Sequence, residues 1–354
     1  RYEYPDVLLY RAGRGDVLVE RDGSPVASWA GCADGTRALV LAGAESGQAM
    51  PVGLERHVPD RADYGSGSPE AIAAFKAQGA VALVAHTEAF TAEQLVQLPL
   101  DGFEMFNLHA NTLRNASAAL ELVTRAESNE PGMPHPDLGV LAILDEDPRY
   151  LERWGTVLAR GARRVTTLGT DCHRNTFKTV LADGERIDSY RRMMGWFSNH
   201  LLVRPEPDGG WDDRHLKEAL RAGRLYGAFE FLGFPRGFDF TAEAGTDVRE
   251  MGAEVSLGAS PELVVRLPAV QDLDPEGAAP KLIARLLRAR EGGWDEVARG
   301  EGAELRHRPA GTGAYRAEIR MQPRHLERWL GRDAARLARQ EVVWIYSNAL
   351  YVTP

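Results

Sequence analysis

The stretch VTTLGTDCH, residues 165–173, is the part of the sequence on which the fold prediction depends. Its first four residues are apolar or β-branched and follow a basic segment at 160–164, which is typical of a strand in a repeating helix–strand unit. Asp171 and His173 then lie at the carboxyl end of that strand, where α/β folds gather ligands and catalytic groups. A carboxylate and an imidazole can bind zinc, manganese or iron and activate water. The alternative is a surface turn in which Asp171 caps the next helix.

The composition excludes several classes of protein. The 354 residues suffice for two domains or for one large domain with an appendage. A net charge of −9 leaves no basic excess to neutralise phosphates, so we expect no nucleic-acid partner. No run of about 18 apolar residues occurs, so we expect no membrane span. Cys32 and Cys172 are the only cysteines, which rules out a disulfide framework and leaves Cys172 as a ligand, a nucleophile or a packing residue.

The chain begins with Arg1 rather than Met, so we expect a processed or trimmed segment before it. We expect a soluble protein of bacterial type. Export is one option for its location, and the oligomeric state is open.

Helix and strand patterns alternate between residues 68 and 168, which predicts parallel strands covered by helices. An α/β barrel fits best, because the candidate ligands then fall on one side of it, and a doubly wound sheet is the competing architecture. The expected helices are residues 69–78, 91–98, 111–128 and 147–161, and the expected strands are 81–85, 102–107, 138–144 and 165–168. Shorter strands are expected at 6–10, 16–20 and 37–41.

Titratable side chains follow several of these strands. Glu45 comes after residues 37–41, His86 and Glu88 come after 81–85, and His109 comes after 102–107. A single histidine at a strand end is usually structural. Several in successive units favour a shared site at the carboxyl ends of the strands.

The pattern changes after residue 176. Residues 186–202 predict a long amphipathic helix and 214–222 a second helix. From about residue 236, short alternating segments separated by Gly and Pro predict a β-sandwich. We therefore expect two domains, 1–235 and 236–354, with the second as a packing or recognition module. The charged stretch 288–299 is expected to form a solvated hairpin or a short helix.

Five segments together resemble the polymerase and histidinol phosphatase (PHP) family of metallohydrolases, and in particular its carbaryl-hydrolase-like branch. They are LAGAE at 41–45, VAH at 84–86, GTDCH at 169–173, ALRAGRLY at 219–226 and WIYSNALYV at 344–352. The resemblance covers residue 37 to the end. It implies a distorted PHP-type (β/α) barrel that holds two or three divalent metal ions and is followed by a C-terminal β-sandwich.

The resemblance also implies roles for individual residues. Glu45 would bridge metal ions, His86 and His173 would donate imidazole nitrogens, and Asp171 would bind through a carboxylate oxygen. Residues expected in supporting positions are Glu88, Glu104 and Asn107, which would orient the imidazoles, His109, which would shuttle a proton, and Arg174 and Asn175, which would hold a substrate oxygen.

The sequence also departs from the family pattern. Residues 1–36 contain no histidine, although the family opens with a His-x-His strand. After Glu45 the chain has GQAMP at 47–51 where the family offers a histidine, and His57 is the nearest substitute. The remaining four ligands suffice for one metal ion.

Two functions are expected from these observations. The first is a metal-dependent hydrolase of a small-molecule ester or phosphoester, with zinc, manganese or iron as the ion, a phosphoester as the first expected substrate and a carboxyl or carbamate ester as the next. The second is a non-catalytic binding or structural protein whose metal site has decayed, which the missing histidines favour.

Overall fold

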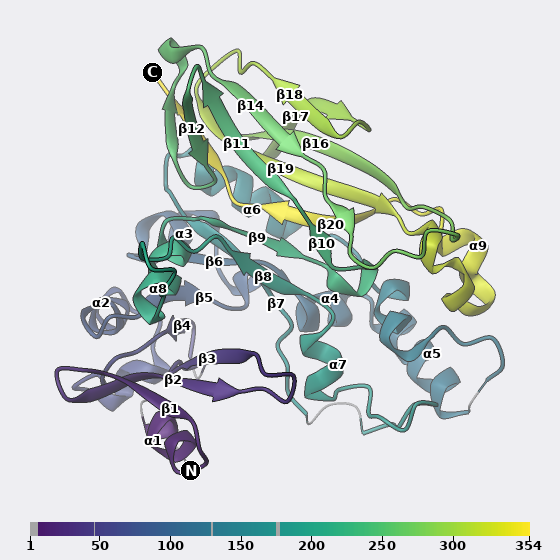
Figure 1. The fold of residues 1–354 in the computed structure, drawn as a ribbon, viewed down its shortest axis with the longest axis horizontal. Coiled ribbons are helices and arrows are strands. Elements are labelled where there is room, and N and C mark those ends of the chain that lie inside the picture. The colour runs from purple at the N-terminus through teal and green to yellow at the C-terminus, as the bar shows by residue number, and fades with distance from the viewer. Residues whose placement is uncertain (1–5, 46, 129, 175–177) are drawn as a thin grey trace. The chain divides into compact units, whose positions relative to one another are not determined.

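The computed structural model describes residues 6–45, 47–128, 130–174 and 178–354 (Figure 1). The chain forms two compact units, each built from several segments. Unit 1 comprises Arg1–Glu104, Ala162–Thr166 and Leu201–Arg224, and unit 2 comprises Met105–Gly161, Thr167–His200 and Leu225–Pro354. The expected domains 1–235 and 236–354 stay a prediction, because compactness alone does not decide which segments fold independently.

Unit 1 begins with helix α1 (Asp6–Ala12), where a strand was expected at 6–10. An acidic residue in its first turn and Arg11 in its last suit a helix dipole, and Leu8 is buried. A three-stranded antiparallel sheet follows, formed by β1 (Val17–Arg21), β2 (Ser24–Gly31) and β3 (Arg37–Leu41).

A four-stranded sheet has the order β4 (Ala49–Val52), β5 (Val81–Val84), β6 (Gly102–Asn107) and β7 (Val165–Gly169). The helices before β5 and β6 are α2 (Pro69–Ala77) and α3 (Ala92–Gln97). Ser68 caps α2, and Thr91 and Gln94 form a capping box on α3, so local signals fix both starts. These strands and helices confirm the elements predicted for residues 69–107 and 165–168.

The predicted (β/α) barrel is wrong. Strands make up 33% of the chain and helices 29%, several sheets are antiparallel, and no barrel closes in the described part of the chain. The expected strand at 138–144 is a 3-10 helix over Pro136–Ala142, with a proline at its start. In addition, β4 pairs antiparallel with β5, and only β5 and β6 have a parallel register among the pairs resolved in this sheet.

The expected long helix at 186–202 is also wrong. It is replaced by the short helix α7 (Tyr190–Met194) and strand β8 (Ser198–Leu201), with Gly195 at the end of α7. Strand β8 pairs in a large sheet of order β13-β21-β19-β20-β9-β8, to which β16 and β17 add through β19. Its other strands are β9 (Leu225–Ala228), β13 (Glu254–Ser256), β16 (Lys281–Arg290), β17 (Gly293–Gly300), β19 (Gly313–Gln322), β20 (Val342–Ser347) and β21 (Leu350–Thr353).

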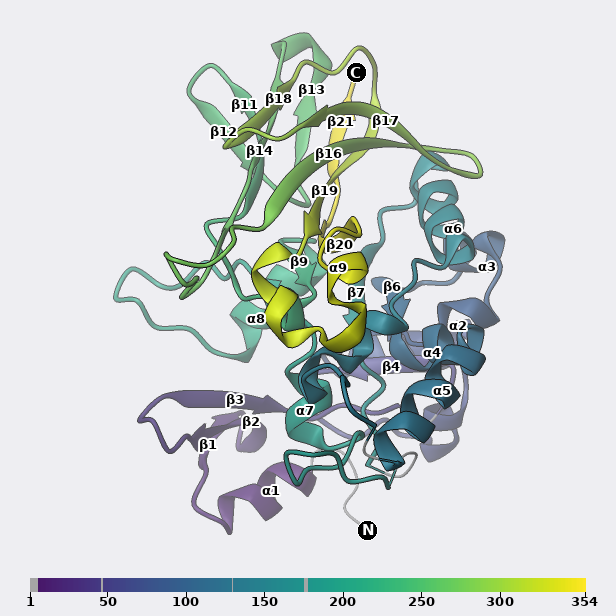
Figure 2. The same cartoon turned by 90° about the vertical axis from the view of Figure 1, so that its right-hand side faces the viewer.

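The large sheet corrects the picture of a sandwich appended to a barrel. Strands β8 and β9 precede residue 236, yet β9 pairs directly with β20. A smaller sheet of order β12-β11-β14-β18 lies next to the large one in unit 2 (Figure 2). Its strands are β11 (Asp239–Ala244), β12 (Asp247–Glu250), β14 (Glu262–Arg266) and β18 (Glu304–His307), and β10 (Pro235–Arg236) pairs with β15 (Ala269–Val270). The stretch 288–299 lies in the β16–β17 hairpin, one of the two forms expected.

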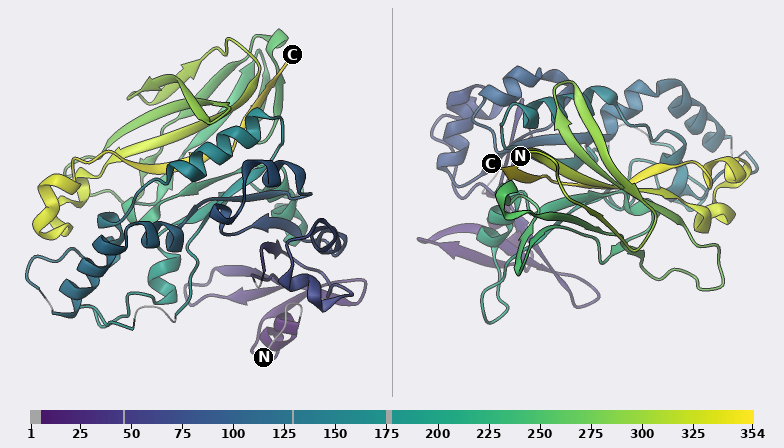
Figure 3. Two further views of the ribbon diagram at one scale, coloured as in Figure 1. Left: turned by 180° about the vertical axis from the view of Figure 1, so that it is seen from behind. Right: turned by 90° about the horizontal axis from the view of Figure 1, so that it is seen from above.

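Helix α6 (Pro148–Ala159) packs across the large sheet (Figure 3). The approach requires Gly155, because a Cβ there would lie 2.0 Å from the carbonyl oxygen of Gly293. Beside it, the buried Arg316 guanidinium lies 4.5 Å from the ring centre of Trp154 and pairs with Glu318 at 3.0 Å. Helices in the described part of the chain are all too short or too polar to cross a membrane.

Candidate metal centre

Three side chains of unit 2 meet at one point: His109, Asp171 and His173. His109 is the second residue of helix α4 (Leu108–Arg114), which starts directly after β6, whereas the other two follow β7. Nδ1 of His109 lies 2.6 Å from Oδ2 of Asp171, and Nε2 of His173 lies 2.9 Å from Oδ1. The two ring centres are 4.9 Å apart. Each carboxylate oxygen of Asp171 therefore has an imidazole beside it.

Asparagine side chains fix both chain segments that carry these residues. The Asn107 side chain caps α4 by accepting a hydrogen bond from the Ala110 N–H at 3.0 Å, and Asn111 of the same helix donates to the Asp145 carbonyl. At the end of β7, Asn199 accepts from the Leu168 N–H at 2.8 Å and donates to the Leu168 carbonyl at 2.9 Å. The backbone on both sides of the cluster is thus held by side-chain hydrogen bonds.

The backbone at Asp171 has a left-handed conformation, with φ 49°. Such a conformation is unfavourable for most residues, although Asp tolerates it better than most, and it is often found at functional sites. It occurs two residues beyond the last residue of β7. The same geometry recurs at His86, which has φ 47° and lies two residues beyond β5.

The donor set fits a divalent metal ion. One ligand atom from each of the three residues lies within 4.8 Å of the others. The separations of 2.6 and 2.9 Å between the ring nitrogens and the Asp171 oxygens are shorter than those between ligands that share an ion, so the rings would shift if the three residues held one. Two imidazoles with one carboxylate occur in catalytic zinc sites and in non-haem iron sites.

The three side chains of the cluster differ in how far they are exposed to solvent. The side chain of Asp171 is 2% exposed, whereas those of His109 and His173 are 27% and 45% exposed. The carboxylate is therefore buried and the imidazoles are partly accessible, so water or a substrate could reach an ion held by them.

His109 lies at the cluster, where a proton shuttle had been predicted. Its distance to Asp171 makes it a possible third ligand instead. In the sequence, His109 could be recognised as a candidate because it comes just after a predicted buried strand, as His86 does. The hydrogen bonds between Asn199 and Leu168 could not be predicted from the sequence, because a helix was expected at residues 186–202.

The predicted ligands Glu45 and His86 lie together in unit 1. Nε2 of His86 is 3.6 Å from Oε1 of Glu45, and Nδ1 is 3.2 Å from Oε1 of Glu88. Glu88 therefore contacts the imidazole as a second-layer acceptor would. All three side chains are between 31% and 43% exposed. The roles assigned to them stay predictions.

The other predicted residues are more dispersed. Glu104 is buried on β6, where its carbonyl accepts a hydrogen bond from the Thr87 hydroxyl at 2.6 Å. Arg174 is exposed, and its carbonyl accepts from Arg186. Asn175 lies outside the described residues. His57 lies 3.5 Å from Asp6, which gives it a partner of its own.

The thiol of Cys172 is not prepared for nucleophilic attack. Burial and the carboxylates of Asp188 and Asp171 raise its pKa. A raised pKa keeps the thiol neutral, and so a weak nucleophile, in the protein without a metal ion. The role of Cys172 as a ligand or a packing residue stays a prediction.

A cavity of about 200 Å³ adjoins the cluster within unit 2, and His109 and His173 form part of its wall. The remaining wall is mostly aliphatic and comes from α4, α5 (Ala116–Glu127), residues 133–143 and 181–188, and Met193 and Trp196. An apolar cavity beside convergent polar groups is the usual form of a small-molecule site.

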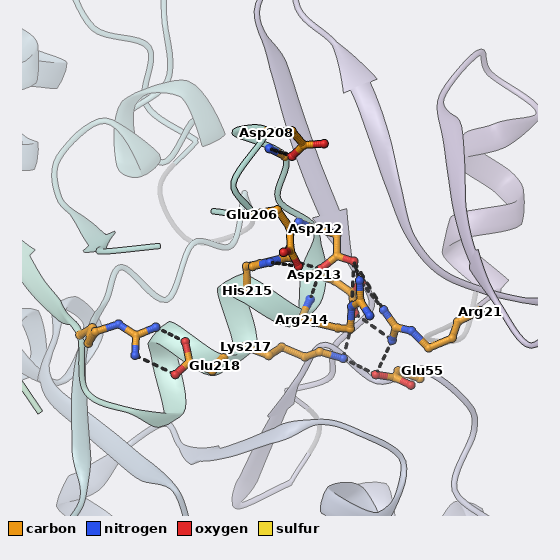
Figure 4. A network of polar contacts seen from close by, with 12 residues as sticks. Arg21, Glu55, Glu206, Asp208, Asp212, Asp213, Arg214, His215, Lys217 and Glu218 are labelled. Atoms are coloured by element: carbon orange, nitrogen blue, oxygen red, sulfur yellow. Dashed lines mark hydrogen bonds and ion pairs between the residues drawn. The ribbon is translucent and has the colours of Figure 1, made fainter. Parts of the chain in front are cut away.

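A second cluster of charged side chains lies in unit 1, around helix α8 (Asp213–Arg221) (Figure 4). Asp213 pairs with Arg21 at 2.9 Å and with Lys217 at 3.0 Å, and Glu55 pairs with Arg21 at 2.8 Å. Burial raises the pKa of Glu55, but Lys217 and Arg21 outweigh this and lower it overall. The carboxylates of this cluster are paired with side-chain cations, so no bound ion is needed to balance their charge.

The chain matches none of the models of known protein families, and no curated protein matches it either. The resemblance to the PHP family therefore stays a prediction.

Proposed function

We propose that the protein is a metal-dependent hydrolase of ester bonds, with a divalent ion held by His109, Asp171 and His173. The observation that carries the proposal is the placement of an imidazole at each oxygen of a buried carboxylate, next to an apolar cavity. The first expected substrate is a phosphoester, followed by a carboxyl or carbamate ester.

The ligand charges suit hydrolysis. Two neutral imidazoles and one carboxylate leave a divalent ion with a net positive charge, and such an ion lowers the pKa of a coordinated water toward neutrality. Asp171 is buried, lies two residues beyond β7 and contacts both rings, so it can orient them as ligands. In the reaction, the water oxygen forms a bond to the phosphorus or acyl carbon. The bond from that atom to the ester oxygen breaks, and the departing alcohol takes up a proton.

Metal content and turnover test the proposal together. The purified protein, with and without added zinc, manganese or iron, is analysed for bound metal and assayed on phenyl phosphate and phenyl acetate. We expect about one equivalent of metal and metal-dependent turnover. Asp171→Asn and His173→Ala should lower both by at least about tenfold. His307→Ala, on strand β18 in the smaller sheet, is the matched control and should change neither.

Two outcomes contradict the proposal. Failure to bind any of the three metals would favour the non-catalytic alternative. Bound iron with oxygen consumption and no ester turnover would move the protein to the non-haem oxygenases, which use the same ligand types.

A further inference from the structure

We propose that the cavity beside His109 and His173 binds one uncharged apolar group of the substrate, of one carbon ring or two fused rings. The inference deepens the proposed function and rests on it for the reaction. Binding of the apolar group depends on the cavity alone.

The wall of the cavity is suited to carbon and hydrogen rather than to polar atoms. Leu122 from α5, Val140 and Ile143 from the segment before α6, and Trp196 after α7 are among the side chains that enclose it. Removing apolar surface from water is the main favourable term when a ligand enters such a cavity. A polar group placed there would lose its hydrogen bonds to water.

The volume limits the size of that group. At about 200 Å³, the cavity is somewhat larger than an apolar cavity of about 150 Å³ that holds benzene. It is smaller than the roughly 300–1,000 Å³ of sites for drug-sized ligands. One ring therefore fits easily, and two fused rings, at about one and a half times the volume of benzene, also fit.

Asp188, the one acidic side chain among the described residues of the wall, is already neutralised. Its two oxygens accept hydrogen bonds from Nε and Nη2 of Arg186, each at 2.7 Å, and the residue is 2% exposed. A carboxylate paired in this way offers little attraction to a cationic ligand. The group that enters the cavity should therefore be uncharged.

The two histidines connect the cavity to the reaction. His109 and His173 line it, and both contact Asp171. An apolar group held in the cavity is then close to the bound ion. The ester bond to be cleaved is accordingly the one nearest this group in the substrate.

Gly139 lies where the cavity can be narrowed without distorting the backbone. A Cβ at this position would meet Cδ2 of Leu122, also in the wall, at 3.5 Å, which is an ordinary contact. The glycine is not among those with positive φ, so other residues can adopt its conformation. Gly139→Val should fill part of the cavity, and Leu122→Ala should enlarge it.

Binding of phenol and 2-naphthol to metal-free protein, measured by calorimetry, tests the proposal. In the wild type we expect both alcohols to bind, and 2-naphthol to bind more tightly because it has more apolar surface. Gly139→Val should weaken 2-naphthol binding by about tenfold or more and phenol binding by less, because the narrowed cavity excludes the larger ring system first. The control Gly31→Val, on β2 with open space around it, should change neither. Failure of both alcohols to bind the wild type, or equal binding to the wild type and to Gly139→Val, would overturn the proposal.

Turnover of phenyl and 2-naphthyl esters separates this inference from the proposed function. If phenol binds with the expected pattern but no ester is hydrolysed, the hydrolase function fails and the apolar subsite stands. If both esters are hydrolysed at equal kcat/KM in the wild type and in Gly139→Val, the subsite proposal fails and the hydrolase function stands.

Discussion

The two clusters of titratable side chains, one in each compact unit, differ in how their charge is balanced. In unit 1, Asp213 and Glu55 are paired with Arg21 and Lys217. In unit 2, both oxygens of Asp171 face imidazoles, which are neutral in the form that binds metals. The first cluster is complete as a structural network, whereas the second has the ligands for a cation.

The side chains of the two clusters also differ in how far they are exposed to solvent. The side chains of Asp213 and Lys217 are 0% and 4% exposed, so no solute reaches their contact. His173 is 45% exposed, and its ring lines a cavity. Arg21 and Glu55 at the edge of the network are 26% and 27% exposed, so the difference lies at the two buried carboxylates. Asp213 contacts a buried ammonium, whereas the imidazoles that contact Asp171 are partly exposed.

The largest expected effect is on the network of unit 1. Asp213→Ala leaves Lys217 buried with one partner fewer, so we expect a loss of about 3–5 kcal/mol in the free energy of unfolding, measured by urea denaturation. Asp247→Ala, which removes an exposed pair with Arg249, is the control and should cost less than about 1 kcal/mol. Equal effects of the two variants would contradict the structural role.

A fall in pH should lower the stability contributed by a network of ion pairs around Glu318 in unit 2. Burial raises the pKa of Glu318, but the charges of Arg316, Arg320 and Arg285 outweigh this and lower the pKa from 4.5 to about 2. A pKa lowered in the folded state stabilises the protein above pH 4.5, and about 3 kcal/mol is lost as the pH falls from 4.5 to 2. Unfolding midpoints across this range measure the loss. Glu318→Gln should show a flatter dependence on pH, and an unchanged slope would refute the assignment.

A smaller effect is expected where a structural contact supports the candidate site. Asn107→Ala removes the cap of α4, so we expect about 1 kcal/mol less stability and about tenfold weaker metal binding through His109. Asn107→Asp keeps a capping oxygen and should restore most of the stability. Isothermal titration with zinc and thermal unfolding separate the two effects, and metal affinity that is unchanged in Asn107→Ala would rule out a positioning role.

The smallest expected change in stability is at the site itself. Without metal ions, Asp171→Asn should unfold within about 0.5 kcal/mol of the wild type, because Asn also tolerates a left-handed backbone. With zinc, the Tm of the wild type should rise and that of the variant should not. The comparison breaks down if Asp171→Asn is as destabilising as Asp213→Ala, since Asp171 would then be a structural residue.

Local signals predicted much of unit 1 and the strands that carry the site. Ser68 and Thr91 mark the starts of α2 and α3, and β-branched runs mark β5 and β7. The helices predicted at 147–161 and 214–222 are present, whereas two other segments were wrong, the strand at 138–144 and the helix at 186–202. The apolar run at 138–144 fits either a strand or a buried helix, and most of it lies in a 3-10 helix that begins at Pro136.

The candidate site was predictable in part for the same reason. Asp171 and His173 follow a strong strand signal, so their place at its end could be expected. The role of His109 beside Asp171 depends on where α4 begins, and the hydrogen bonds from Asn199 depend on strand β8. Both are set by tertiary pairing of segments that are distant in the sequence, which local patterns do not encode.

The pairing of β9 with β20 has a consequence for how the protein is made. Residues 225–228 of β9 are synthesised long before residues 342–347 of β20, so the edge of β9 that pairs with β20 is at first unpaired. All four residues of β9 are buried in the folded protein. An apolar strand with an unpaired edge can associate with other chains. Slower synthesis at low temperature or a holding chaperone should therefore raise the yield of folded protein, and a fragment of residues 1–235 should aggregate.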